Sequence, residues 1–348
     1  MLSFQRLFLL GAVELSNTQA VSQPKQGRAS LLFLLVLGQI LALLFVFALA
    51  RLFFYDRSLV LIWINMYTLY FYLPAYLILV LALALRQKAL AAAAVGIIIF
   101  HLFLVVPTLI PTTNFGKTAP AGETVRLFNA NLLFLNEETD AMIAEIEQAD
   151  ADVLVFQEYT PAWDAAFNES WMAEAYPYRL MDSEDSPFGA AIWSKRPLTD
   201  TVATAWGNTT DLNGTLQTTI QIDDQLVRLQ NVHPPPPFGQ SEKWNAIRDE
   251  IRETAVAEPL PLILIGDLNM TQHNRQYKAL LNEGFYSLHQ ELGKGMTVSW
   301  PNGTRLLPPP VRLDHAFISP ELVGVSLYDG IGAGSDHRPF VVDVALGD

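Results

Sequence analysis

The sequence predicts an α+β domain with helices outside two paired sheets, preceded by three transmembrane helices. Residues 29–111 are almost free of charged side chains, which is typical of membrane-spanning helices. Residues 124–348 instead contain many short apolar runs bounded by turn residues, with a few helical patterns between them. Strands mixed with a few helices in one chain indicate a sandwich of sheets covered by helices.

Composition divides the chain into two parts of opposite charge. Of the 348 residues, 51% are hydrophobic and only 16% are charged. Residues 1–117 hold 8 Lys and Arg against 2 Asp and Glu, whereas residues 118–348 hold 14 against 33, a net charge of −19. There is no cysteine, which excludes disulfides, thiol nucleophiles and cysteine-ligated zinc. We therefore expect a basic membrane region followed by an acidic soluble domain.

The first part of the chain predicts a short tail and three membrane spans. We expect residues 1–28 to be retained, because no small-residue cleavage site closely follows their short apolar core. Three apolar runs are each long enough to cross a bilayer: Ser30–Ala50, Leu59–Leu85 and Ala89–Ile110. Pro74 lies inside the second run, where a membrane helix tolerates it. The alternative is three core helices of a soluble protein, which three such runs in tandem disfavour.

The basic residues around these spans predict the orientation. With the N-terminus inside the cell, five basic residues lie on the inner side and three on the outer side. This bias predicts an integral inner-membrane protein with its C-terminal domain on the extracytoplasmic side. The inner residues are Arg6, Lys25, Arg28, Arg86 and Lys88, and the outer ones are Arg51, Arg57 and Lys117.

The second part of the chain predicts a linker at residues 112–123 and a domain at residues 124–348. Helices are expected near Glu138–Gln148, Pro161–Ala173, Gln240–Ala257 and Asn274–Asn282. Strands are expected at Thr124–Asn131, Asp152–Gln157, Gly189–Ser194, Thr201–Ala205, Thr215–Ile222, Leu226–Val232, Pro261–Ile265, Arg312–Ser319 and Pro339–Val344.

Several predicted strands end in polar residues. Asp267 and Asn269 follow a buried strand and lie two residues apart, so an extended backbone points both side chains to one side. The carboxylate can hold a cation or a water, and the amide can donate to a developing oxyanion. A simple turn is the alternative. Other strand ends carry Asn129, Asn131, Glu158, His233, Asp314, Asp336 and His337.

Several of these residues also have a purely structural interpretation. Asn129 and Asn131 suit a turn, and Glu158 suits the start of a helix. His337 could be a satisfied core histidine. Pro234–Pro237 follow His233 directly, and a rigid loop is favoured over a wall of a substrate cleft.

Taken together and in order, the motifs resemble those of the endonuclease/exonuclease/phosphatase (DNase I-like) hydrolases. They are Phe-Asn-Ala-Asn at 128–131, Gln-Glu at 157–158, Gly-Asp-Leu-Asn at 266–269, Leu-Asp at 313–314 and Gly-Ser-Asp-His-Arg-Pro at 334–339. The resemblance covers about residues 124–345. It implies a four-layered α/β/β/α sandwich with the site at one edge of the two sheets.

The resemblance also implies a metal site. Glu158 is expected to be the principal Mg²⁺ ligand, with Asn129 beside it and Asp336 assisting. Both Glu158 and Asn129 supply the hard oxygen ligands that Mg²⁺ prefers, and Mn²⁺ is a second possibility. Asn131 is expected to support the site and the substrate.

Catalytic roles follow from the same resemblance. His337 is expected to activate water or stabilise the attacked phosphorus, with Asp314 fixing its tautomer. Asp267 would orient the attacking water, and Asn269 would bind a non-bridging oxygen. His233 would contact the phosphate and protonate the leaving oxygen.

These inferences predict a membrane-anchored, Mg²⁺-dependent phosphoester hydrolase. Two alternatives remain: a nuclease of the same fold, and a non-catalytic membrane protein with a degenerate domain. The complete set of polar residues argues against the last. Because polyanion binding draws on Lys and Arg, the charge of −19 favours a small or lipid-borne phosphoester, such as a lipid head group, over duplex DNA.

Overall fold

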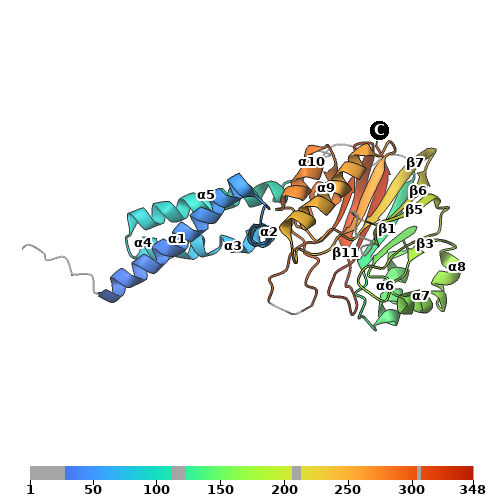
Figure 1. Ribbon diagram of the computed structural model, residues 1–348, viewed down its shortest axis with the longest axis horizontal. Helices are drawn as coiled ribbons and strands as arrows, with labels where there is room; N and C mark the ends of the chain where they lie inside the picture. The colour runs from blue at the N-terminus through green and yellow to red at the C-terminus, as the bar shows by residue number, and fades with distance from the viewer. Residues whose placement is uncertain (1–27, 112–121, 206–212, 304–306, 348) are drawn as a thin grey trace, which may run out of the picture.

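The computed structural model describes residues 28–111, 122–205, 213–303 and 307–347. A bundle of long helices forms one end of the molecule and a compact sheet domain forms the other (Figure 1). The α+β prediction is confirmed, because two sheets lie together with helices on their outer faces.

Each sheet has six strands. The first has the order β11-β12-β1-β2-β4-β3, and the second has the order β5-β6-β7-β8-β10-β9. The strands are β1 (Thr124–Asn131), β2 (Val153–Gln157), β3 (Tyr178–Asp182), β4 (Ala190–Ser194), β5 (Thr199–Ala205), β6 (Asn213–Ile222), β7 (Gln225–Val232), β8 (Leu262–Asp267), β9 (Tyr286–Ser287), β10 (Asp314–Ile318), β11 (Leu322–Asp329) and β12 (Phe340–Leu346).

Helices cover the outer face of each sheet. The first sheet is covered by α6 (Thr139–Ala149), α7 (Pro161–Asn168) and α8 (Met172–Ala175), and the second by α9 (Ser241–Ala257) and α10 (Arg275–Asn282). A further short helix, α11 (Leu288–Glu291), packs beside β10 and β11. These layers explain why the central strands are nearly continuous apolar runs, since both of their faces are buried.

The period of two along each strand decides which side chains enter the space between the sheets. In β8, Ile263 and Ile265 belong to the core between the sheets, whereas Leu262 and Leu264 pack against the outer helices. Asp267 continues the inner row. The same row leads to Asn129 and Asn131 in β1, Gln157 in β2, Asn231 and His233 at the end of β7, and Asp314 in β10.

The pairing of the strands brings these row ends to one edge. β1 is parallel to β2, with Asn131 opposite Gln157, and β7 is parallel to β8. β10 runs antiparallel to β8 and places Asp314 opposite Asp267. Polar ends of rows from both sheets therefore meet at one edge of the sandwich.

The membrane region differs from the prediction in its second span. Two helices, α1 (Arg28–Phe54) and α5 (Lys88–Leu109), are long and apolar enough to cross a membrane. The predicted span 59–85 is instead divided into α2 (Leu59–Met66), α3 (Thr68–Phe71) and α4 (Pro74–Ala84), with a bend of 80° at the break. Pro74 contributes to the second interruption, because its ring cannot follow a regular helical turn.

The reason for the first interruption is that α2 belongs to the sheet domain. Ile62 is fully buried and Met66 is 2% exposed, and both pack into the cluster that joins α9 and α10 to the second sheet. Apolar composition alone cannot separate a side chain that faces lipid from one that faces a protein core. The helix α2, which lies before the predicted linker at residues 112–123, therefore packs against the sheet domain.

This packing predicts unequal effects at two neighbouring positions of α2. Ile62→Ala should destabilise the sheet domain by about 2–5 kcal/mol, because it leaves a cavity in a closed cluster. Val60→Ala is the control, since Val60 is 59% exposed and its truncation should cost less than about 0.5 kcal/mol. Thermal unfolding of the full chain in detergent measures both. Equal effects of the two variants would contradict the docking of α2.

Candidate active site

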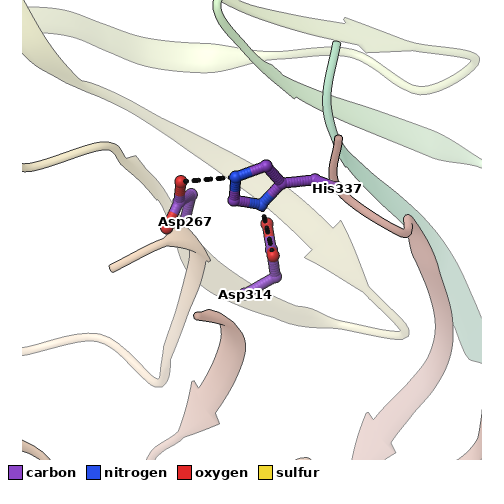
Figure 2. A group of neighbouring side chains, drawn as sticks. All are labelled: Asp267, Asp314 and His337. Carbon is purple, nitrogen blue, oxygen red and sulfur yellow. Dashed lines mark hydrogen bonds and ion pairs between the residues drawn. The ribbon is translucent and has the colours of Figure 1, made fainter. Parts of the chain in front are cut away.

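His337 lies between two carboxylates at the edge where the sheets meet. Its Nδ1 is 2.8 Å from Asp314 Oδ2, and its Nε2 is 3.6 Å from Asp267 Oδ2 (Figure 2). Asp314 and Asp267 come from adjacent strands, and His337 comes from the loop before β12. All three side chains are buried. The ring is therefore held at both nitrogens, with Asp314 fixing its orientation.

Asp267 is the group around which the remaining polar residues gather. Its Oδ2 accepts from Asn131 Nδ2 at 3.2 Å and lies 3.5 Å from His233 Nε2. Its Oδ1 accepts from the backbone N–H of Asn269 at 2.9 Å. Donors from both sheets thus converge on one carboxylate that is 1% exposed.

The backbone around this carboxylate is unusually constrained. Gly266 has φ +147°, and a Cβ there would lie 2.1 Å from the carbonyl oxygen of Val232 in the neighbouring strand. Asn269 and Glu158 adopt positive φ values of 47° and 57°. Such conformations in residues other than glycine cost free energy and gather at functional sites.

Charges in the site shift one another's pKa values. Burial by itself lowers the pKa of His337, but Asp314 and Asp267 outweigh it and raise the pKa to about 10. Burial likewise opposes the charged form of His233, whereas Asp267 raises its pKa. Burial raises the pKa of Asp314. For Asp267 the two imidazoles outweigh burial and lower the pKa. At neutral pH, His337 is therefore an imidazolium beside the ionised Asp267, and the same carboxylate favours the charged form of His233.

Glu158 lies at the first-sheet side of the site, and it contacts Asn131. Its Oε1 accepts from Asn131 Nδ2 at 2.9 Å, and its Oε2 accepts from the backbone N–H of Phe134 at 3.0 Å. The carboxylate remains half-buried rather than enclosed. The oxygens of Glu158 are of the hard type that Mg²⁺ prefers, so this residue fits a magnesium ion chemically. Asn131 meets Glu158 with Nδ2, while its Oδ1 accepts from the backbone N–H of Leu133 at 3.0 Å.

Asn129 has a different surrounding from the predicted one. It is completely buried, and its Oδ1 accepts from Gln157 Nε2 at 3.0 Å. Asn131, two residues closer to the strand end, makes the hydrogen bond to Glu158. Asn269 also departs from expectation, because its Nδ2 donates to the carbonyl of Pro234 at 3.0 Å and so ties together the turns after β7 and β8.

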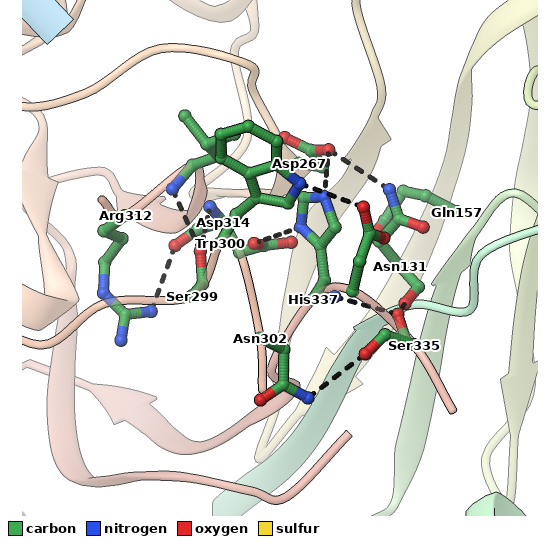
Figure 3. A network of polar contacts seen from close by, with 12 residues as sticks. Asn131, Gln157, Asp267, Ser299, Trp300, Asn302, Arg312, Asp314, Ser335 and His337 are labelled. Carbon is green, nitrogen blue, oxygen red and sulfur yellow. Dashed lines mark hydrogen bonds and ion pairs between the residues drawn. The ribbon is translucent and has the colours of Figure 1, made fainter. Parts of the chain in front are cut away.

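Asp336 directly precedes His337 in the loop before β12. It is half-buried, and its Oδ2 accepts from Trp300 Nε1 at 3.0 Å (Figure 3). Ser335 supports the same loop, since its hydroxyl donates to the carbonyl of Asn131 and accepts from the backbone N–H of His337. The loop that carries Trp300 therefore forms one wall of the site.

Asp267, Asp314 and His337 are also close enough together to hold a metal ion by distance alone. The contact between Nδ1 and Asp314 and the raised pKa of the imidazole instead indicate a proton at that nitrogen. Glu158 is the better candidate for a cation, because its half-buried carboxylate is hydrogen-bonded to Asn131 and Phe134 rather than to a histidine.

Some residues of the site were missed in the sequence. Gln157 donates to Asn129 and to Asn231 Oδ1 at 2.8 Å, and Asn231 donates to the carbonyl of Phe156. This network joins the two sheets below the site. The signal was present, because Gln157 and Asn231 continue the inner rows of β2 and β7 at a spacing of two. Ser299, Trp300 and Ser335 lie in loops and carry no such signal.

Comparisons with known proteins agree with this fold. The family model described as "Endonuclease/Exonuclease/phosphatase family" matches residues 125–337. No curated protein matches the sequence.

Several solved structures share the fold. D. rerio TDP2 complexed with a single-strand DNA product has a TM-score of 0.55 and 17% identity, over 64% of this chain and 99% of that chain. An endonuclease/exonuclease/phosphatase from Beutenbergia cavernae has a TM-score of 0.52 and 17% identity, over 64% of this chain and 72% of that chain. The 3′ phosphatase NExo from Neisseria, bound to a product DNA hairpin, has a TM-score of 0.50 and 17% identity, over 63% and 98%.

The charge of His337 predicts a pH dependence of stability. Its folded-state pKa of about 10 lies above the ordinary value of about 6.5. Its contribution is therefore fully present below pH about 6.5 and is lost as the pH rises through about 10. The gap in melting temperature between the wild type and His337→Asn should narrow over this range in EDTA.

His289→Asn is the control for this experiment. Burial lowers the pKa of His289 well below its ordinary value, so its contribution is lost only as the pH falls. The gap for His289→Asn should stay constant from pH 6.5 to 10. A constant gap for His337→Asn as well would show that the ring is not held as an imidazolium.

Proposed function

This chain belongs to the endonuclease/exonuclease/phosphatase family and is a phosphoester hydrolase, and we propose that it is anchored in a membrane and depends on a divalent metal. The observation that carries the assignment as a hydrolase is the convergence of His337, His233 and Asn131 on Asp267 at the edge of the sandwich. The imidazolium of His337, the imidazole of His233 and an amide around one carboxylate suit a phosphate and a water together. A degenerate binding domain would not retain this set.

We assign the metal to Glu158, with Asn131 supporting its carboxylate, Asp336 at the margin of the site and Asn129 as the support beneath it. Mg²⁺, or Mn²⁺ in its place, would act as a Lewis acid on a phosphoryl oxygen. Glu158 contributes a half-buried carboxylate that accepts a hydrogen bond from Asn131.

The chemistry of the protein's own groups follows from their hydrogen bonds. Asp267 accepts a hydrogen bond from the attacking water and orients it toward phosphorus. The imidazolium of His337 donates from Nε2 to the phosphoryl oxygen on which charge develops. Asp314 keeps the ring in place through Nδ1. His233 lies across Asp267 and donates to the phosphate or to the leaving oxygen, while Asn269 holds the two turns together.

We propose a small or lipid-borne phosphoester as the substrate. Residues 118–348 carry a net charge of −19, and such a domain binds a long polyanion weakly. Phe238 and Leu307 are 71% and 80% exposed. The ring of Phe238 packs 5.8 Å from Trp63 of α2, and Tyr70 of α3 donates to the carbonyl of Pro310. Apolar side chains therefore lie on loops next to the membrane-side helices.

A nuclease is the second candidate. TDP2 and NExo, which share the fold, were each solved with a DNA product. The deciding experiment measures kcat/KM of the full chain in detergent with Mg²⁺ on plasmid DNA, single-stranded DNA, lipid phosphodiesters and small phosphodiesters. Higher specificity for the lipid or small substrates supports our proposal. A clearly higher kcat/KM for DNA at physiological salt would contradict our proposal and support a nuclease.

We also propose that the protein is integral to the inner membrane, with its hydrolase domain on the extracytoplasmic side. The support is the five-to-three bias of basic residues over three crossings, in which the bent helix pair of residues 59–84 counts as one span beside α1 and α5. A C-terminal alkaline phosphatase fusion should be active, and an inactive fusion would reverse the orientation.

Glu158→Gln should abolish most of the activity at any Mg²⁺ concentration, because an amide cannot replace the charge of a carboxylate ligand. The melting temperature should change little, since the half-buried carboxylate packs against few groups. Glu169→Gln is the control, because Glu169 is exposed on the outer face and should leave the activity intact. Near-normal turnover of Glu158→Gln at saturating Mg²⁺ contradicts the assignment.

His337→Ala should lower kcat by about 10²–10⁴-fold, as expected for an acid–base or electrostatic group. Asp314→Asn should also be impaired, because the ring loses the carboxylate that orients it. The double variant should be little worse than His337→Ala alone, since the two residues act as a unit. Simple additivity of the two losses on the logarithmic scale would show that they act independently.

A further inference from the structure

The turn between α1 and α2 contains a buried carboxylate outside the active site. Asp56 is 1% exposed, although it lies between two apolar helices. It accepts from Asn65 Nδ2 at 2.6 Å, from the backbone N–H of Arg275 at 2.6 Å and from Asn274 Nδ2 at 3.3 Å. A buried charge is stable only with such a shell of donors. Two of these donors belong to the hydrolase domain.

A buried cation lies on the other side of Asn65. Arg51, near the end of α1, is 2% exposed and donates to Asn65 Oδ1, to Thr68 Oγ1 at 3.1 Å and to the carbonyl of His273 at 2.8 Å. Asn65 therefore bridges Arg51 and Asp56. Arg51 and Asp56, which carry opposite charges, therefore both form hydrogen bonds with residues 273–275 of the hydrolase domain.

Asp56 takes the place of a helix cap for α10. Asn274 is the residue before α10, but its side chain makes no capping bond to the helix. Its Oδ1 accepts from the backbone N–H of Thr271, and its Nδ2 faces Asp56. The first N–H of the helix, that of Arg275, goes to Asp56 instead. A carboxylate here satisfies an otherwise unpaired donor and interacts favourably with the helix dipole.

The segment that Asp56 holds begins in the active site. Residues 268–275, which we call the 268–275 loop, run from the turn after Asp267 to the start of α10. At the near end, Arg248 of α9 donates to the carbonyls of Leu268 at 2.7 Å and Asn269 at 3.1 Å. At the far end the loop is fixed by Asp56 and Arg51. Asn269 has φ +47°, a conformation that persists only where its surroundings determine it fully.

The same turn also holds the helix that carries Arg248. Asn245 Nδ2 donates to the carbonyl of Asp56 at 2.8 Å, and Ser241 Oγ donates to the carbonyl of Arg57 at 3.1 Å. Figure 1 shows α2 beside α9 and α10 at the junction of the two parts. The turn therefore fixes both supports of the 268–275 loop, namely the start of α9 and the start of α10.

We propose that Asp56 is a positioning residue for the hydrolase site. Its carboxylate caps α10, and its carbonyl holds α9, so it sets the 268–275 loop and through that loop the geometry of Asp267 and Asn269. The membrane region is thus a part of the catalytic framework and does more than tether it. The kinetic test of this proposal rests on the proposed phosphoester hydrolysis.

The test compares Asp56→Ala, Asp56→Asn and Arg57→Ala in the full chain in detergent, with bis(4-nitrophenyl) phosphate and Mg²⁺. Misplacement of reacting groups by about 1 Å costs about 10²-fold, so Asp56→Ala should lower kcat by about that factor. KM should change by less than about twofold, because substrate-binding groups remain in place. Asp56→Asn keeps the shape and loses the charge, and it should lose less. Arg57→Ala is the matched control, since this side chain is exposed.

Hydrogen exchange gives a second readout that does not need turnover. Amides of residues 270–275 should exchange faster in Asp56→Ala and Asp56→Asn, whereas those of β8 should not change. A folded Asp56→Ala with wild-type kcat, or with a raised KM alone, overturns the proposal. If Asp56→Ala does not fold, wild-type kcat and exchange in Asp56→Asn overturn it. If the wild type cleaves no phosphoester, the proposed function fails, and exchange alone decides on Asp56.

Discussion

The structure depends on the burial of one carboxylate, Asp267, between two sheets. Burial alone would favour its neutral form, and the imidazoles of His337 and His233 reverse this preference. Because these partners come from loops after different strands, the carboxylate can stay ionised only if the strands keep their register. The same constraint explains Gly266, where any side chain would push β8 away from β7. Fold and chemistry are linked at this group.

Much of the sheet domain could be predicted from the sequence, and the reason is the period of two. Val153, Val155 and Gln157 in β2, like Ile263, Ile265 and Asp267 in β8, form rows that change from apolar to polar at one end. Such rows predict where the strands lie, which of their faces point inward, and at which edge of the sheets the site is found. The rows could not separate the roles of Asn129 and Asn131, because both point inward. Only the depth of each residue in the sheet distinguishes them.

The membrane region was harder to predict, because lipid and a protein core select the same residues. Ile62 and Met66 are as apolar as their neighbours in α1, but they pack on Trp244 and Tyr277 rather than on lipid. The evidence lay in the polar residues. Asp56 and Asn65 would be costly in a hydrocarbon layer. Asn65 donates to Asp56, and Asp56 accepts from the backbone N–H of Arg275 in the hydrolase domain. Polar residues beside an apolar run therefore help to indicate which part of the run packs on a protein domain.

The most direct test of this account is the protonation state of His337. With selectively ¹⁵N-labelled histidine, NMR of the full chain in detergent at pH 8 without metal should show His337 with both ring nitrogens protonated. The Nδ1 proton should be strongly deshielded by Asp314, and this signal should be lost in Asp314→Asn. A neutral His337 at pH 8, with one unprotonated nitrogen, would contradict the arrangement of an imidazolium shared between two carboxylates.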